Sequence, residues 1–135
     1  VKIGIDAVYV SNHGGRQLDH GRGGVDLLPE IVKAVNGKAK IIFDGGIMRG
    51  ADVVKAMIMG ADCVGIGRLQ GLAAGAAGED GLVRMLELLE EEAIAALGML
   101  GVTNWDQLDM SYLHAAPEVT PPHVLSAFPL LDEGY

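Results

Sequence analysis

The stretch Lys40-Ile41-Ile42-Phe43-Asp44-Gly45-Gly46 decides the fold, because it leads a short apolar strand directly into a glycine turn. Two other stretches have the same order. Residues 7–10 are rich in strand-forming side chains and lead into Ser11-Asn12-His13-Gly14-Gly15. Residues 63–66 lead into Gly67-Arg68. Continuous apolar strands of this kind are typical of a parallel sheet that is buried on both faces.

The segments that follow these strands have helical periodicity. An apolar face within residues 27–35 predicts a first helix, with Asp26 as its N-cap and Pro29 in its first turn. A second helix is expected over residues 52–59. A third is expected over residues 81–98, with these glutamates on its solvated face: Glu87, Glu90, Glu91 and Glu92.

The alternation of strands and helices predicts an α/β fold built from right-handed βαβ units. A closed (β/α)8 barrel needs about 250 residues, whereas this chain has 135. Three units do not close a barrel, so we interpret residues 1–114 as half of one. Residues 115–135 contain four prolines and are expected to form an extended tail.

The composition excludes several classes of protein. The formal net charge of -8 argues against nucleic acid as a partner through bulk electrostatics. No apolar run reaches the roughly 18 residues of a transmembrane helix. The single cysteine, Cys63, lies in an apolar run and is expected to be a buried core residue. These features favour a reducing, cytoplasmic setting, with any membrane association arising elsewhere in a parent protein.

The first candidate motif is SNHGGRQLD at residues 11–19, directly after a strand. In a barrel, the carboxyl ends of the strands form the active-site face. His13 is suited to moving a proton near neutral pH, and Arg16 can bind a carboxylate through two hydrogen bonds. The alternative interpretation is a glycine-rich turn with a surface histidine, and the residues alone leave both open.

Two further motifs indicate a phosphate site. Residues 44–50, DGGIMRG, join the second strand to its helix, and Gly67-Arg68 follow the third strand. Glycines at such a turn expose backbone N–H groups, and the N-terminus of a helix favours negative charge. Phosphate sites of this kind are found after the last strands of many barrels. No spacing typical of metal ligands is present, so we expect no bound metal.

The run SNHGGRQLD resembles the signature of the FMN-dependent 2-hydroxy acid oxidases and dehydrogenases, a family of TIM-barrel enzymes. The resemblance extends from about residue 7 to the mid-nineties and corresponds to strands six to eight of that barrel. It implies that His13 is the catalytic base and that Arg16 binds the substrate carboxylate. It also implies an FMN site in which Asp44 bonds the ribityl chain and these residues surround the phosphate: Gly45, Gly46, Gly67 and Arg68.

One position departs from the family pattern. Met48 stands where the family usually has an arginine that contacts the FMN phosphate, and Arg49 follows it. Either Arg49 compensates for the missing charge, or the affinity for the phosphate is reduced.

The resemblance implies oxidation of a small 2-hydroxy acid, such as lactate, glycolate or mandelate, to the 2-keto acid. The acidic partner of the histidine and other site residues of the family would precede Val1. We therefore expect a C-terminal fragment that is inactive alone. Its partner would be the N-terminal half of the barrel or a second copy, in a homo-oligomer. The alternatives are a non-catalytic half-barrel that binds FMN or phosphate and self-associates, and another phosphate-binding barrel enzyme.

Overall fold

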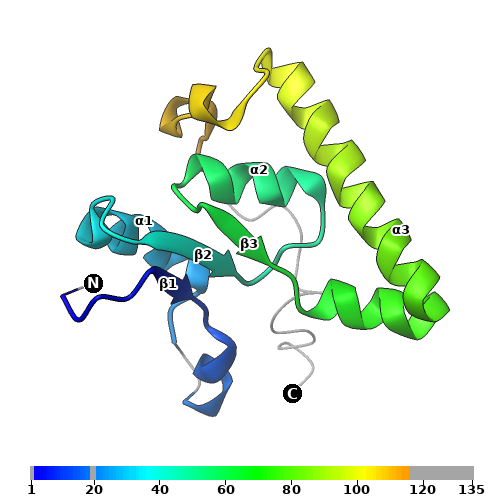
Figure 1. The fold of residues 1–135 in the computed structure, drawn as a ribbon, viewed down its shortest axis with the longest axis horizontal. Helices are drawn as coiled ribbons and strands as arrows, with labels where there is room; N and C mark the ends of the chain where they lie inside the picture. Colours follow the sequence, from blue (N-terminus) through cyan, green and yellow to red (C-terminus); the bar gives the residue numbers. More distant parts are fainter. Residues whose placement is uncertain (1, 19–20, 116–135) are drawn as a thin grey trace.

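The computed structural model describes residues 2–18 and 21–115, so the predicted tail falls almost entirely outside the described residues. The described chain is an α/β unit with one three-stranded parallel sheet in the order β1-β2-β3 (Figure 1). This confirms the predicted alternation of strands and helices. The strands and α-helices are β1 (Ala7–Val10), α1 (Gly24–Val35), β2 (Lys40–Asp44), α2 (Gly50–Ile58), β3 (Cys63–Gly65) and α3 (Arg68–Leu100).

The sheet has one packed face and one open face. Val10, Ile41 and Phe43 are buried and form a core with Leu28 of α1. Their neighbours along the strands point the other way, because successive side chains of a strand alternate between faces. We call this second side the open face: on it Tyr9 is 55% exposed.

Cys63 also lies on the open face and is exposed, so the prediction of a buried cysteine was wrong. The expectation of a sheet buried on both faces is likewise wrong for the described residues. The cause is the same in both cases: an apolar run shows that side chains can be buried, but the pairing of strands decides which side is covered.

The first helix begins earlier than predicted. Gly23, not Asp26, is the N-cap of α1, and Pro29 lies inside the helix. Gly24 explains the early start, because a Cβ at this residue would lie 3.1 Å from the carbonyl oxygen of Asp44. The glycine lets the helix begin close to the end of β2.

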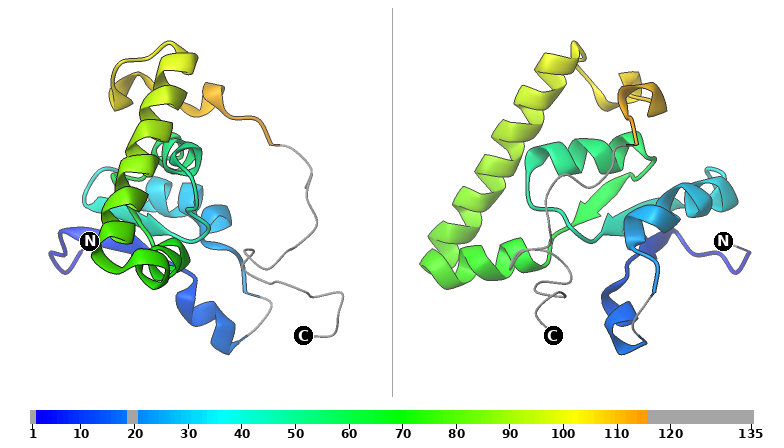
Figure 2. Two further views of the ribbon diagram at one scale, coloured as in Figure 1. Left: turned by 90° about the vertical axis from the view of Figure 1, so that its right-hand side faces the viewer. Right: turned by 180° about the vertical axis from the view of Figure 1, so that it is seen from behind.

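The last helix also begins earlier than predicted, at Arg68. It consists of two limbs that meet at Ala77 and Gly78, where the backbone is not helical (Figure 2). The first limb was not foreseen because its alanines and glycines give no apolar stripe. Ala93 in the second limb packs against Val54 and Ile58 of α2.

The helices α2 and α3 approach each other closely at Gly50. A Cβ at Gly50 would overlap the backbone nitrogen of Ala93 and would lie 2.6 Å from the carbonyl oxygen of Leu89. Because these are backbone atoms of a packed helix, they cannot yield without moving α3.

Asp62, directly before β3, forms hydrogen bonds with the first residues of β2. Its carboxylate accepts a hydrogen bond from the backbone N–H of Ile41 at 2.8 Å and one from Lys40 Nζ at 2.7 Å. The backbone N–H of Asp62 donates to the carbonyl of Ile41 at 2.8 Å. The bonds to Lys40 and Ile41 lower the pKa of the Asp62 carboxyl.

We expect Gly50→Ala to lower the free energy of unfolding by about 1–3 kcal/mol, because the added methyl group overpacks the contact between α2 and α3. Urea unfolding followed by circular dichroism measures the change. The matched control is Gly71→Ala in the first limb of α3, where a Cβ meets nothing within 4 Å. The control should be neutral or stabilising, since alanine favours helix more than glycine does. Equal stabilities of the two variants would contradict the packing argument.

Asp62→Asn should make the free energy of unfolding less dependent on pH in the acid range. A carboxyl whose pKa is lower in the folded chain stabilises the fold above its unfolded pKa of about 4. That contribution is lost as the pH falls through the lowered folded value. The side chain of Asp62 is 38% exposed, so we expect a difference below about 1 kcal/mol, present at pH 6 and absent near pH 2. Urea unfolding at several pH values, with Glu79→Gln on α3 as the control, measures it; a difference that persists at pH 2 would contradict this assignment.

Candidate functional site

All three predicted motifs lie at one edge of the sheet. The strands are parallel and in register, with Val10 beside Phe43 and Asp44 beside Gly65. Their carboxyl ends therefore meet at the same edge, from which the chain continues into the 3-10 helix η1 (His13–Gln17), the Gly45–Gly46 turn and α3 (Figure 1). The sequence placed each motif directly after a strand, and the parallel pairing brings the three ends together.

His13 and Arg16 both lie in η1. The backbone N–H of His13 donates to Ser11 Oγ at 3.2 Å, and its side chain is exposed. The segment projects away from the sheet, as the views in Figures 1 and 2 agree. A Cβ at Gly15 would overlap the side chain of Asn12, so a larger residue there would have to move that side chain. His13 and Arg16 are three positions apart in this 3-10 helix.

The turn after β2 leaves its backbone accessible. Gly45 and Gly46 adopt φ values of 114° and 80°, which favour glycine, and a Cβ at either residue would meet nothing within 4 Å. Asp44, directly before them, is half-buried, and its side chain lies next to the hydroxyl of Tyr9. Tyr9 was not predicted to be a site residue. The alternation of side chains in residues 7–10 was the available signal, since it places Tyr9 opposite the core.

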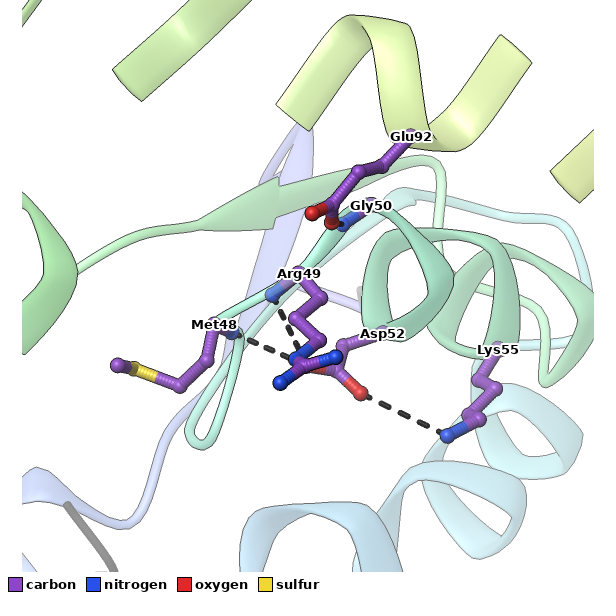
Figure 3. A network of polar contacts seen from close by, with 6 residues as sticks. All are labelled: Met48, Arg49, Gly50, Asp52, Lys55 and Glu92. Atoms are coloured by element: carbon purple, nitrogen blue, oxygen red, sulfur yellow. Dashed lines mark hydrogen bonds and ion pairs between the residues drawn. The ribbon is translucent and has the colours of Figure 1, made fainter. Parts of the chain in front are cut away.

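The N-terminus of α2 is already occupied by carboxylates (Figure 3). Asp52 Oδ2 accepts hydrogen bonds from the backbone N–H groups of Met48 and Arg49, both at 3.1 Å. Glu92 Oε2, from α3, accepts one from Gly50 at 2.7 Å. Glu92 was predicted to lie on the solvated face of its helix. That prediction is incomplete, because Glu92 also bonds the backbone of α2. A phosphate at this helix end would have to displace both carboxylates.

The N-terminus of α3 differs from that of α2 in the acidic residues of its own first turn. Its N-cap is Gly67, which has no side chain to accept from the helix, and the first turn carries no acidic residue. A Cβ at Gly67 would meet nothing within 4 Å, and the first helical residue, Arg68, is exposed. Two similar glycine turns thus differ in the acidic residues of the helices that follow them, and the helix whose first turn has no acidic residue is better suited to an anion.

The exposed Arg49 is the N-cap of α2. It extends from the loop that joins Gly46 to the helix, beside the half-buried Met48. A guanidinium at this position adds positive charge near the glycine turn.

Neither a metal centre nor a membrane span is present in the described part of the chain. No group of three or more histidine, cysteine or acidic side chains is arranged to hold a metal ion within residues 2–18 and 21–115. Within the same residues, no helix is both long and apolar enough to cross a bilayer.

Comparisons with known proteins agree on one family. Residues 1–115 match the family model of the FMN-dependent dehydrogenases. The L-lactate oxidase of Nostoc sp. is 48% identical over 116 residues, which cover 84% of this chain and 31% of that protein. The 2-hydroxyacid oxidase 1 of Mus musculus is 44% identical over 119 residues, covering 87% of this chain and 32% of the relative.

Solved structures lead to the same family. A crystal structure of mandelate oxidase superimposes with a TM-score of 0.75 at 45% identity, over 78% of this chain and 31% of that one. A mandelate oxidase variant with a monooxide FMN adduct gives the same TM-score and identity. The chain thus spans about a third of the length of the relatives it matches. By its sequence and its fold, this chain belongs to the family of FMN-dependent dehydrogenases.

Proposed function

We propose that this chain is the C-terminal part of a TIM barrel that oxidises a small 2-hydroxy acid with FMN. Its strands would be about the sixth to the eighth of that barrel, within residues 1–114, followed by the tail of residues 115–135. The observation that carries the proposal is the meeting of the three motifs at the carboxyl edge of a parallel sheet. That edge is where barrel enzymes hold their substrates.

The residues of this chain are suited to binding the ribityl chain and the phosphate of FMN. Asp44 would accept hydrogen bonds from the ribityl hydroxyl groups, and Gly45 and Gly46 would donate backbone N–H groups to the phosphate. Gly67 and Arg68 would complete the phosphate site at the N-terminus of α3. The carboxylates at α2 support this placement, because they disfavour a second anion at that helix end. Arg49 would supply the charge that Met48 does not.

The chemistry divides between the cofactor and the protein. FMN, when bound, accepts the two electrons that leave a 2-hydroxy acid as it becomes a 2-keto acid. His13 would take up the proton, from either the substrate hydroxyl or the α-carbon. Arg16 would hold the substrate carboxylate and fix the position of the reacting carbon. Because His13 is exposed, the rest of the site would have to shield it from water.

The remaining strands would come from a partner. Tyr9 and Cys63 face the side of the sheet that would line the interior of a closed barrel, and both are exposed. We propose that the N-terminal half of the barrel covers this open face. Without it the substrate site lacks walls, so the chain alone is inactive.

A flavin titration tests the cofactor site. We expect the chain to bind FMN saturably and more tightly than riboflavin, which lacks the phosphate. Arg68→Gln should weaken FMN about tenfold or more, the effect of losing a hydrogen bond to a charged group, and leave riboflavin unchanged. Arg84→Gln is the control, since Arg84 pairs with Glu87 and Glu91 on α3. Quenching of flavin fluorescence measures both affinities; equal affinity for FMN and riboflavin would contradict the phosphate site.

The isolated chain should not reduce its flavin when a 2-hydroxy acid is added. We expect the visible flavin absorbance to remain unchanged on anaerobic addition of lactate, glycolate or mandelate to the chain in the presence of FMN. Dithionite, which reduces flavins chemically, is the positive control. Bleaching by any of the three acids would show that the chain is a complete catalyst.

A self-associating half-barrel is the second candidate. It is favoured by the open face and by the outer edge of β1, which pairs with no other strand of the described residues. Unpaired strand edges promote association between chains. Sedimentation equilibrium distinguishes the candidates: a stable dimer that binds flavin would favour the self-associating module, and a monomer would favour a chain that needs an N-terminal partner.

A further inference from the structure

Tyr9 lies on the open face beside Asp44, the residue proposed to hold the ribityl chain. In the register of the sheet Tyr9 pairs with Ile42, and Asp44 follows Ile42 by two residues on the same face. Gly65 pairs with Asp44 on the next strand. Tyr9, Asp44 and Gly65 therefore form a row that crosses all three strands.

The hydroxyl of Tyr9 and the side chain of Asp44 are neighbours, because both lie next to the point where a Cβ of residue 65 would stand. Partial burial raises the pKa of the Tyr9 hydroxyl, and its interaction with the Asp44 carboxylate raises it further. The thiol of Cys63 adds a smaller effect in the same direction. The phenol therefore keeps its proton at neutral pH and remains a donor.

The contact requires that residue 65 has no side chain. A Cβ at Gly65 would overlap the hydroxyl oxygen of Tyr9 and would lie 3.1 Å from the Cβ of Asp44. The ring carbon Cζ of Tyr9 would be 3.4 Å away, which is an ordinary van der Waals distance. The space above Gly65 is thus filled by the tyrosine hydroxyl itself, and a methyl group there would push it away from Asp44.

We propose that Tyr9 is a positioning residue for Asp44, and that its hydroxyl holds the carboxylate in the orientation that receives the ribityl hydroxyl groups of FMN. This inference rests on the proposed function, because it requires that Asp44 contacts the ribityl chain. A carboxylate has about four acceptor sites, so one phenol leaves capacity for a ligand. A side chain that is already fixed also loses less conformational freedom when the ligand binds.

The test compares two flavins, because the ribityl chain occurs in both FMN and riboflavin. Tyr9→Phe removes the hydroxyl and keeps the ring. It should raise the dissociation constants of FMN and riboflavin by the same factor, about three- to tenfold, the effect of one hydrogen bond. This differs from Arg68→Gln, which should affect FMN alone. Tyr112→Phe, at an exposed tyrosine of the 3-10 helix η3 (Met110–Tyr112), is the control and should leave both constants unchanged.

Two further variants separate positioning from general stability. In the Asp44→Asn background, Tyr9→Phe should cause little additional loss, because the group that it positions is altered already. Gly65→Ala should weaken both flavins with the Tyr9 hydroxyl still present, and Tyr9→Phe combined with Gly65→Ala should be no worse than Tyr9→Phe alone. Far-UV circular dichroism shows that each variant is folded.

Unchanged flavin affinity in Tyr9→Phe would overturn the role of Tyr9. So would a loss that is equally large in the Asp44→Asn background, since Tyr9 would then act independently of Asp44. Failure of the unsubstituted chain to bind either flavin would overturn the proposed cofactor site, and this inference with it. The two failures are distinguishable, because only the first occurs in a chain that binds flavin.

Discussion

The structure depends on the parallel pairing of β2 with a strand on each side. Because β2 is central, its alternating side chains define both faces of the sheet: Phe43 points into the core beneath α1, and Asp44 points to the open face. The same pairing brings the ends of three strands, and the three motifs that follow them, to one edge. A shift of one residue in the register of β2 would exchange the two faces and would move Asp44 into the core.

Charge distinguishes the two glycine turns at this edge. Both join a strand to a helix, and either would attract an anion on geometry alone. At the N-terminus of α2, the carboxylates of Asp52 and Glu92 accept hydrogen bonds from backbone N–H groups. Glu92 comes from α3, which can approach closely because residue 50 is glycine. The turn before α3 carries no acidic side chain in its first helical turn. The packing of α3 on α2 therefore also influences which helix end can receive a phosphate.

Much of the fold could be predicted from local sequence. The strands were placed to within a residue, because short apolar runs that end in glycine have few other interpretations. Helix boundaries were less accurate. Asp26 was expected to cap α1, yet the helix begins before it, where Gly24 fits against the end of β2. The first limb of α3 was missed because alanine and glycine give no periodic signal. At α1, a contact with another element outweighed local preference.

The sequence by itself determined the order of elements, the parallel arrangement and the positions of the candidate site residues, because each depends on residues that are neighbours along the chain. Tertiary structure alone decided that Cys63 is exposed, that Glu92 bonds Gly50 and that the hydroxyl of Tyr9 reaches Asp44. The bond between Glu92 and Gly50 joins residues 42 positions apart. Such contacts have no local signature, since they exist only after strands have paired and helices have packed.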